Sequence, residues 1–336
     1  MNAASNCQSI CSQLLELFPL QQVLLTTSAT EILLALCGSS SDHICAASLN
    51  DILNALLSSN IIWQSSDATL QMSIIKLLES LTLRICSNSK DIGKTNALSQ
   101  VVSQLVPQIS SDVEGVARGS ANALDSIFQK CLSQGFFSKS SHDSSKQKSS
   151  QLRQMVAVVE SSFGAQYYQS WELSLTIAST LVRKIGRPGA HFAKGLVHKI
   201  GELCAGADDI AAEESGERAH IAHAAQESLG VCLRSLGPEI VLKILPLELE
   251  EALDGHCEGR TWLIPLLKMH IRGCRLGFWL SEMYPNACGL EYRRNKVKQI
   301  GSQSREYNTL YALELQTWST LPSFCSWAED ISDVFR

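Results

Sequence analysis

The chain lacks the sequence features that mark secretion, membrane insertion and nucleotide binding. No apolar run reaches the roughly 20 residues that a membrane-spanning helix needs, and the first basic residue is Lys76, so the start has no basic region of a signal peptide. There is no Asn-x-Ser/Thr glycosylation acceptor and no glycine-rich GxxxxGK(S/T) or GxGxxG loop. These absences predict an intracellular chain with no membrane partner, no nucleotide cofactor and no small-molecule substrate.

Positive charge is missing from the start of the chain and balanced after it. Residues 1–75 contain five acidic residues and no lysine or arginine, which accounts for the whole net charge of −5. The rest of the chain holds all 28 basic residues and the other 28 of the 33 acidic ones. Binding of nucleic acid through bulk positive potential is therefore excluded, and only a local basic patch could supply it.

The twelve cysteines form no CxxC pair, and several stand in apolar helical patterns. Cys37 follows EILLAL, Cys86 follows LTLRI, and Cys232 lies in GVCLRSL. In a reducing compartment such cysteines behave as small core residues. The sequence therefore predicts buried free thiols rather than a disulfide framework.

Apolar residues recur at helical spacing almost everywhere, and strand-like alternation is scarce. SLNDILNALL places Leu or Ile at i, i+3, i+4, i+7 and i+8 from Leu49, and ALSQVVSQLVP repeats that stripe from Leu98. Ser-Ser-Asp helix starts follow at residues 65–67 and 110–112. A two-helix unit that recurs every 45–49 residues predicts an all-α fold. We expect an α-solenoid of antiparallel helix pairs of the HEAT or armadillo type.

Two segments depart from this pattern. Residues 138–150, SKSSHDSSKQKSS, hold no apolar residue and predict a flexible loop between repeats at 1–137 and 151–336. In SLGPEIVLKILPLEL, Gly237 can end one helix in the left-handed conformation and Pro238 suits the first turn of the next. Pro246 disfavours helical geometry at the residue before it. This stretch predicts a packing helix of about two turns.

No group of residues predicts catalysis. Ser141, His142 and Asp143 are triad residue types, but neighbours in a flexible loop cannot hold triad geometry. His220 and His223 lie at i, i+3 and could share a helix face as metal ligands, although HExxH is absent and surface histidines are the ordinary explanation. The sequence therefore predicts no enzyme activity, no cofactor and no metal.

The main basic cluster stands in EYRRNKVKQ and comprises Arg293, Arg294, Lys296 and Lys298. On a helix, the second and fourth of these residues share one side. Such clusters contact RNA phosphates, or they form a solvated helix face, and both interpretations stay open. A thinner cluster comprises Lys184, Arg187 and Lys194. The two would form one RNA-facing stripe only if the helix stack brought them to the same surface.

Three segments follow one another in the second half of the chain: LGPEIVLKILPLEL, TWLIPLLKMHIRGCRLGFWLSEMYP and LQTWSTLPSFC. With them, residues from about 155 onward resemble the ribosomal RNA processing twelve-like proteins, HEAT-repeat factors of small-subunit ribosome assembly. The resemblance implies packing roles for Gly237, Pro238, Pro246, Trp262, Pro265, Arg275, Trp318, Pro322 and Phe324. Members of this family are several times longer, so we expect the chain to be a fragment or a truncated product.

The resemblance implies a non-enzymatic scaffold of the nucleus and nucleolus. On this basis we expect the chain to bind pre-ribosomal proteins and precursor rRNA, and to support rRNA processing and nuclear export of the pre-small subunit. The alternative is a karyopherin-like transport receptor that binds the Ran GTPase and nucleoporins, which the acidic residues 1–75 would suit.

Overall fold

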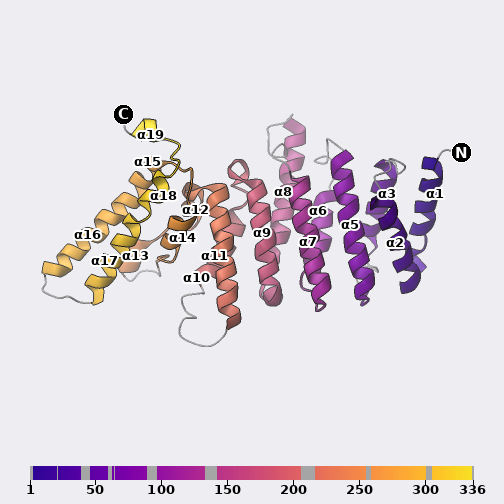
Figure 1. The fold of residues 1–336 in the computed structure, drawn as a ribbon, viewed down its shortest axis with the longest axis horizontal. Helices are drawn as coiled ribbons and strands as arrows, with labels where there is room; N and C mark the ends of the chain where they lie inside the picture. Colours follow the sequence, from indigo (N-terminus) through magenta and orange to yellow (C-terminus); the bar gives the residue numbers. More distant parts are fainter. Residues whose placement is uncertain are drawn as a thin grey trace. The chain divides into compact units, whose positions relative to one another are not determined.

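The chain folds into helices that group into two compact units, Met1–Ile185 (unit 1) and Gly186–Arg336 (unit 2) (Figure 1). The computed structural model describes residues 3–20, 22–38, 46–59, 63, 65–88, 97–132, 142–205, 216–254, 259–299 and 305–334. Within these ranges there is no β-strand. The predicted all-α class is confirmed.

Unit 1 is a stack of helix pairs in two layers (Figure 1). Its helices are α1 (Ala3–Leu15), α2 (Val23–Gly38), α3 (Ala46–Ser58), α5 (Ala68–Asn88), α6 (Ala97–Gln108), α7 (Glu114–Cys131), α8 (His142–Ser161) and α9 (Trp171–Ile185), with 3₁₀ turns η1 (Phe18–Leu20) and η4 (Ala165–Ser170). One layer runs α1, α3, α6, α8 and the other runs α2, α5, α7, α9, each helix packing on the next in its layer. This is the arrangement of an α-solenoid, as the repeat spacing predicts.

The repeated apolar stripes form the interior of this stack. The stripe of α3 and the stripe of α6 occupy equivalent places in the first layer, and their members Leu49, Ile52, Leu53, Leu56, Leu98, Val101, Val102 and Leu105 are buried. Asp67 caps α5 by accepting a hydrogen bond from the Leu70 amide at 2.9 Å, as its start signal predicts. The Ser-Ser-Asp signal at residues 110–112 predicts a start at Asp112, but α7 begins at Glu114. Its N-cap residue is Val113, which makes no side-chain cap hydrogen bond.

Neighbouring helices of the second layer are tied together near their C-terminal ends. Arg84 of α5 donates to the Cys37 carbonyl at the end of α2 (2.9 Å), and Lys184 of α9 donates to the Gln129 carbonyl in α7 (2.6 Å). Cations suit these places because the last carbonyls of a helix lack intrahelical partners and carry partial negative charge.

The prediction of buried free thiols is confirmed at Cys11, Cys37, Cys204, Cys232 and Cys274, whereas the free thiol of Cys325 is exposed and two further cysteines are not free. Burial raises the pKa of Cys37 to about 11 and that of Cys232 to about 12, so both are inert core thiols. Cys86, expected to be a free thiol, forms a disulfide with Cys131. The sequence could not show this pair, because it depends on the direct packing of α5 against α7.

Part of the serine-rich segment 138–150, expected to be a loop, is helical. Helix α8 begins at His142, so residues 142–150 are helical, and residues 138–141 lie outside the described ranges. Serine costs a helix little, and the buried stripe of Leu152, Met155, Val156 and Val159 anchors the helix to which the serines belong. Because α8 and α9 pack on α6 and α7, unit 1 continues to Ile185 instead of ending at residue 137.

Unit 2 has shorter and less regular helices. They are α10 (Lys194–Ala205), α11 (Gly216–Leu236), α12 (Pro238–Ile244), α13 (Leu249–Leu253), α14 (Leu263–His270), α15 (Leu276–Phe278), α16 (Tyr284–Gln299), α17 (Arg305–Trp318), α18 (Leu321–Cys325) and α19 (Ile331–Val334), with a 3₁₀ turn η5 (Arg187–Gly189) and a π-helical turn η7 (Trp279–Met283). α10 pairs with α11, α11 packs on α14, and α16 and α17 form a helical hairpin.

The two-turn helix expected between the prolines is α12. Gly237 precedes it with φ +90°, in the region that favours glycine, and Pro238 occupies its first turn. Val241 and Leu245 are buried. Leu245 packs so closely on Gly201 of α10 that a side chain there would collide with it.

Candidate functional site

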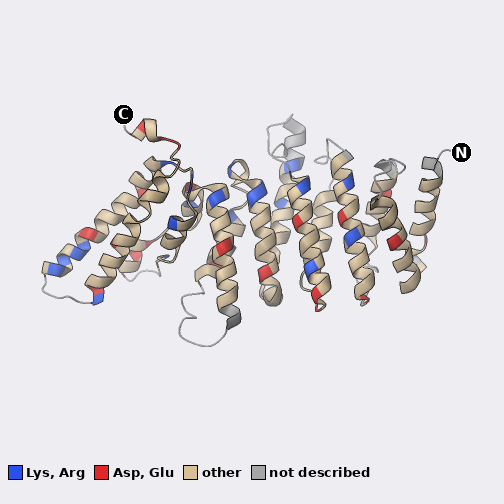
Figure 2. Ribbon diagram, in the orientation of Figure 1, with Lys and Arg blue, Asp and Glu red and all other residues tan. Residues whose placement is uncertain are grey.

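Helix α16 carries all four residues of the main basic cluster and gives them different surroundings. Successive helix residues are about 100° apart, so four cations within six positions spread around the helix instead of lining one face. Figure 2 shows basic residues towards the C-terminal end of α16. The cluster therefore has to be assessed residue by residue.

Arg294 lies between α16 and α17. Its Nε donates to Glu314 Oε2 at 2.6 Å and its Nη2 to Oε1 at 3.5 Å, while Nη1 lies 3.4 Å from the hydroxyl of Tyr307. The guanidinium also stands over the rings of Tyr307 and Tyr311, at 5.9 and 5.4 Å from their centroids. The hydrogen bond with Tyr307 and the charge of Glu314 raise the pKa of Arg294. Arg294 thus joins the two helices of the hairpin.

Arg293 points away from that contact and joins α16 to the end of α13. Its Nη1 and Nη2 donate to the carboxylate oxygens of Asp254 at 2.7 and 3.4 Å. Both members of this pair are partly exposed, with 33% and 49% of their side chains accessible. A phosphate would have to compete with a carboxylate at each of the two arginines.

Lys296 and Lys298 are exposed, and among the described residues neither forms an ion pair. They lie about 160° apart around the helix, so they face different directions. Tyr292 stands one turn before Lys296 on the same side and is 71% exposed. An exposed ring beside a lysine can stack on a base while the ammonium meets a phosphate. The i, i+4 spacing of Tyr292 and Lys296 is the sequence signal for this pair.

The thinner basic cluster does not form a patch within either unit. Lys184 of unit 1 donates to the Gln129 carbonyl. Arg187 of unit 2 binds both carboxylate oxygens of Glu329 at 3.0 Å and donates to the Gly273 carbonyl at 2.9 Å. Lys194 is exposed at the start of α10. Lys184 and Arg187 therefore each stabilise the fold of their own unit through these contacts.

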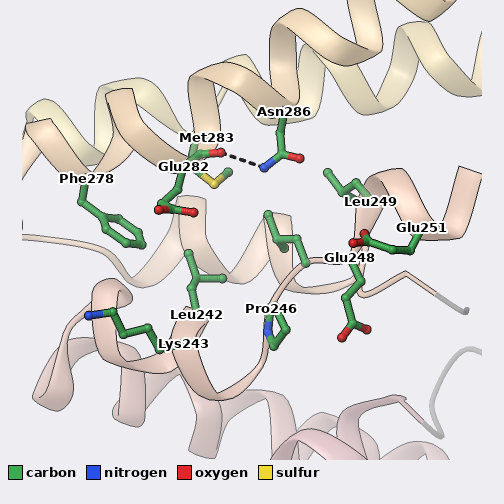
Figure 3. Close-up of a pocket in the computed structure, with 11 residues that line it drawn as sticks. Leu242, Lys243, Pro246, Glu248, Leu249, Glu251, Phe278, Glu282, Met283 and Asn286 are labelled. Atoms are coloured by element: carbon green, nitrogen blue, oxygen red, sulfur yellow. Dashed lines mark hydrogen bonds between the residues drawn. The ribbon is translucent and has the colours of Figure 1, made fainter.

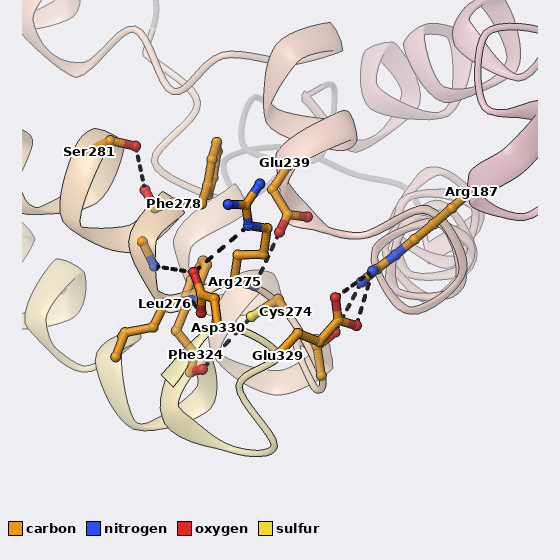
Figure 4. Close-up of polar contacts among 12 residues, drawn as sticks. Arg187, Glu239, Cys274, Arg275, Leu276, Phe278, Ser281, Phe324, Glu329 and Asp330 are labelled. Atoms are coloured by element: carbon orange, nitrogen blue, oxygen red, sulfur yellow. Dashed lines mark hydrogen bonds and ion pairs between the residues drawn. The ribbon is translucent and has the colours of Figure 1, made fainter. Parts of the chain in front are cut away.

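Asp330 holds the segment before α19 against the start of α15 (Figure 4). It is 6% exposed and accepts hydrogen bonds from the amides of Leu276 (2.6 Å) and Gly277 (2.9 Å). Burial raises the pKa of Asp330, but the backbone amide hydrogen bonds and the charge of Arg275 together outweigh it, and the net pKa is lowered. Arg275 lies 3.8 Å from the same carboxylate, and its amide donates to Glu239 at 3.2 Å.

The residues for which the resemblance implies packing roles differ in burial. Pro238 and Phe324 are buried, and Trp262 and Trp318 are half-buried. Trp318 packs on the buried Trp279, with ring centroids 5.3 Å apart. The exposed members are Pro246, Pro265, Arg275 and Pro322. Pro238 and Phe324 thus lie in the interior of unit 2 and the exposed members at its surface, and the packing roles themselves stay predictions.

Pro246 lines a pocket in unit 2 between the α12–α13 segment and η7–α16 (Figure 3). The pocket has a volume of about 290 Å³. Its floor is apolar and includes Leu242, Leu249 and Met283, all buried. Asn286 lies above, its side-chain amide donating to the Glu282 carbonyl at 2.7 Å. Nothing in the sequence alone brings these separate stretches together.

The described residues do not group into a metal centre. Within them, no three His, Cys, Asp or Glu side chains are placed to hold an ion. His220 and His223 are exposed on α11. The triad-type residue Ser141 lies outside the described ranges. No described helix has the length and apolar character of a membrane span.

A family comparison and several individual relatives point to the same group of proteins. The family described as "Ribosomal RNA-processing protein 12, HEAT repeats" matches residues 110–336. The human RRP12-like protein is 25% identical over 335 residues, which cover 97% of this chain and 24% of the human protein. The RRP12-like protein of Gallus gallus is 35% identical over 115 residues, covering 33% of this chain and 8% of that protein.

Ribosomal RNA-processing protein 12 of Saccharomyces cerevisiae is 30% identical over 107 residues, covering 32% of this chain and 8% of the yeast protein. The chain thus spans about a quarter of the human relative's length. The family match takes in the Ser-Ser-Asp start before α7, the rest of unit 1 from that point and the whole of unit 2. Since that match extends over more than half of the residues, the chain belongs to the ribosomal RNA-processing protein 12 family of HEAT-repeat proteins.

Proposed function

We propose that the chain is a non-catalytic scaffold in small-subunit ribosome biogenesis. The relatives are named for ribosomal RNA processing, and the stacked helix pairs of unit 1 offer a long surface built from many small interfaces. Such a surface holds several pre-ribosomal proteins at once, each with modest affinity, and needs no covalent chemistry. This role places the chain in the nucleus and nucleolus, supporting rRNA processing and export of the pre-small subunit.

Within this role, α16 contacts precursor rRNA through Lys296 and Tyr292. The observation that carries this proposal is the exposed ring and ammonium on one side of the helix, next to two arginines that are engaged with carboxylates. A base stacks on Tyr292 and a phosphate lies against Lys296. Lys298, on the other side of the helix, adds a second phosphate contact where the strand passes the helix end.

Salt dependence tests this assignment. The wild-type chain and its variants are titrated into a labelled single-stranded RNA from the small-subunit precursor between 50 and 200 mM salt. Each lost phosphate contact should lower the slope of log affinity against log salt by about 0.7, so Lys296→Gln removes about 0.7. Tyr292→Ala should weaken binding about tenfold, the loss of one stacked base, and leave the slope unchanged.

The double variant Lys268→Gln with Arg272→Gln is the matched control, because both residues are exposed cations of unit 2 outside α16. It should bind RNA with the wild-type slope. RNA binding with unchanged slope and affinity in the Lys296 and Tyr292 variants would contradict the α16 contact. Crosslinking of the tagged chain in cells then separates precursor-RNA contact from association through protein partners alone.

The second candidate is a karyopherin-like transport receptor. Its support is the acidic residues 1–75 and the apolar side chains exposed on α2, Leu24 (84%), Leu25 (42%) and Ile32 (47%), which suit the apolar repeats of nucleoporins. Binding of the isolated chain to GTP-loaded Ran, but not to the GDP-loaded form, would favour this function over the scaffold.

A further inference from the structure

The pocket between α12–α13 and η7–α16 combines an apolar floor with an acidic rim (Figure 3). Glu251 comes from α13 and Glu282 from η7, and their carboxylates are directed toward the space from opposite sides. Glu248 behaves differently, because its carboxylate pairs with Arg260 at 2.7 Å. The rim thus offers two carboxylates from two separate elements.

Neither of these two carboxylates is neutralised within the described part of unit 2. Glu251 and Glu282 are exposed and form no ion pair with a described cation. Lys243 lines the pocket as its basic residue, without an ion pair to either. The net field at the mouth is therefore negative and attracts a cation, while phosphates and RNA are repelled.

Size and chemistry limit what fits. A volume of about 290 Å³ is at the lower end of small-ligand pockets, which begin near 300 Å³. The floor of Leu242, Met283 and Phe278 suits a hydrocarbon stem. A long side chain with an apolar stem and a cationic head matches both parts, and arginine and lysine are the residues built that way.

We propose that this pocket binds an arginine-bearing, otherwise apolar segment of a partner protein. The stem of the arginine lies on the apolar floor, the guanidinium lies between Glu251 and Glu282, and a neighbouring apolar residue contacts Pro246 and Leu249. This gives the exposed Pro246 a role that core packing does not supply. The site is separate from the RNA contact, since Lys296 stands ten residues, about 15 Å, further along the helix than Asn286.

Fluorescence anisotropy with a labelled pentapeptide GLRLG and the full chain tests the proposal. GLRLG should bind, GLQLG should bind about tenfold more weakly, and GLELG should not bind, because two charge-assisted contacts are lost or reversed. Glu251→Gln with Glu282→Gln should reduce GLRLG affinity about tenfold, to the level of GLQLG. Lys243→Glu should strengthen GLRLG binding by about threefold, which loss of folding could not produce.

The matched control is Glu291→Gln with Glu306→Gln, which removes the same charge from exposed positions of α16 and α17 outside the pocket. It should leave GLRLG affinity unchanged. Equal binding of GLRLG and GLQLG, equal weakening by the control, or no binding of GLRLG to the wild-type chain would each overturn the proposal. Displacement of the bound peptide by a single-stranded RNA oligomer would also overturn it, because the site would then take nucleic acid.

Discussion

Arg294 gives the sharpest test of whether the basic helix is a structural element or an RNA ligand. Its ion pair with Glu314 is mostly buried, with 16% and 10% of the two side chains accessible. Removing one partner of a buried pair leaves an uncompensated charge and costs about 3–5 kcal/mol. We take about 3 kcal/mol for Arg294→Met, because both side chains retain some contact with water. For a unit of this size that corresponds to a melting temperature lower by roughly 6–12 °C.

The double variant Arg294→Met with Glu314→Leu should recover at least half of this loss, since no buried carboxylate remains without a partner. Arg293→Met provides the matched control on the same helix: its pair with Asp254 is exposed, so it should cost less than about 1 kcal/mol. Urea unfolding followed by circular dichroism measures all three. If Arg294→Met leaves the free energy of unfolding unchanged and lowers the salt slope of RNA binding, the structural assignment is refuted and Arg294 is a phosphate ligand.

Three further predictions concern the packing that holds the units. The lowered pKa of Asp330 means that its stabilising contribution is present above the unfolded pKa of about 4 and is lost as pH falls through the lower folded value; acid titration of Asp330→Asn should lack this step. Gly237→Ala should cost about 2 kcal/mol, because φ +90° strains any side chain, whereas Gly115→Ala, which meets no atom within 4 Å, should be neutral or stabilising; thermal melts would show equal shifts if strain is irrelevant. Cys131→Ser should lower the free energy of unfolding of the non-reduced chain by up to about 4 kcal/mol and leave that of the reduced chain unchanged. Equal losses in urea unfolding of both forms would show that the variant disturbs packing and not the disulfide.

The fold could be predicted because it follows from local periodicity. The stripes from Leu49 and Leu98 need only a 3.6-residue period to specify helices and a constant spacing to specify a repeat. Gly237 and Pro238 specify the start of α12 because their backbone preferences act within a few residues. The sequence did not predict that residues 142–150 are helical, because their serine-rich composition is local. The apolar residues that hold α8 in place lie in its C-terminal half.

The site was less accessible to sequence reasoning because its partners are distant in the chain. The carboxylates that bind the two arginines of α16 come from Asp254 and Glu314, which no local pattern connects with EYRRNKVKQ. Likewise, the pairing of Cys86 with Cys131 and the meeting of Glu251 with Glu282 at one pocket depend on which helices pack together. Charge counted along the sequence is therefore not charge available at the surface.

The same helix illustrates how neighbouring residues acquire opposite roles. Because each step along α16 turns the side chain by about 100°, Arg293 and Arg294 meet two different acidic partners and hold the helix in place. With those cations compensated, Lys296 and Tyr292 present an RNA-compatible face near the C-terminal end, while Glu282, just before its N-terminal end, contributes to a negative pocket. The proposed scaffold gains from such a division, since the arginine-bearing segment proposed for the pocket and the RNA strand proposed for Lys296 do not compete. Charge reversal at one end should then leave binding at the other unchanged, and coupling between the two would show that they form a single site.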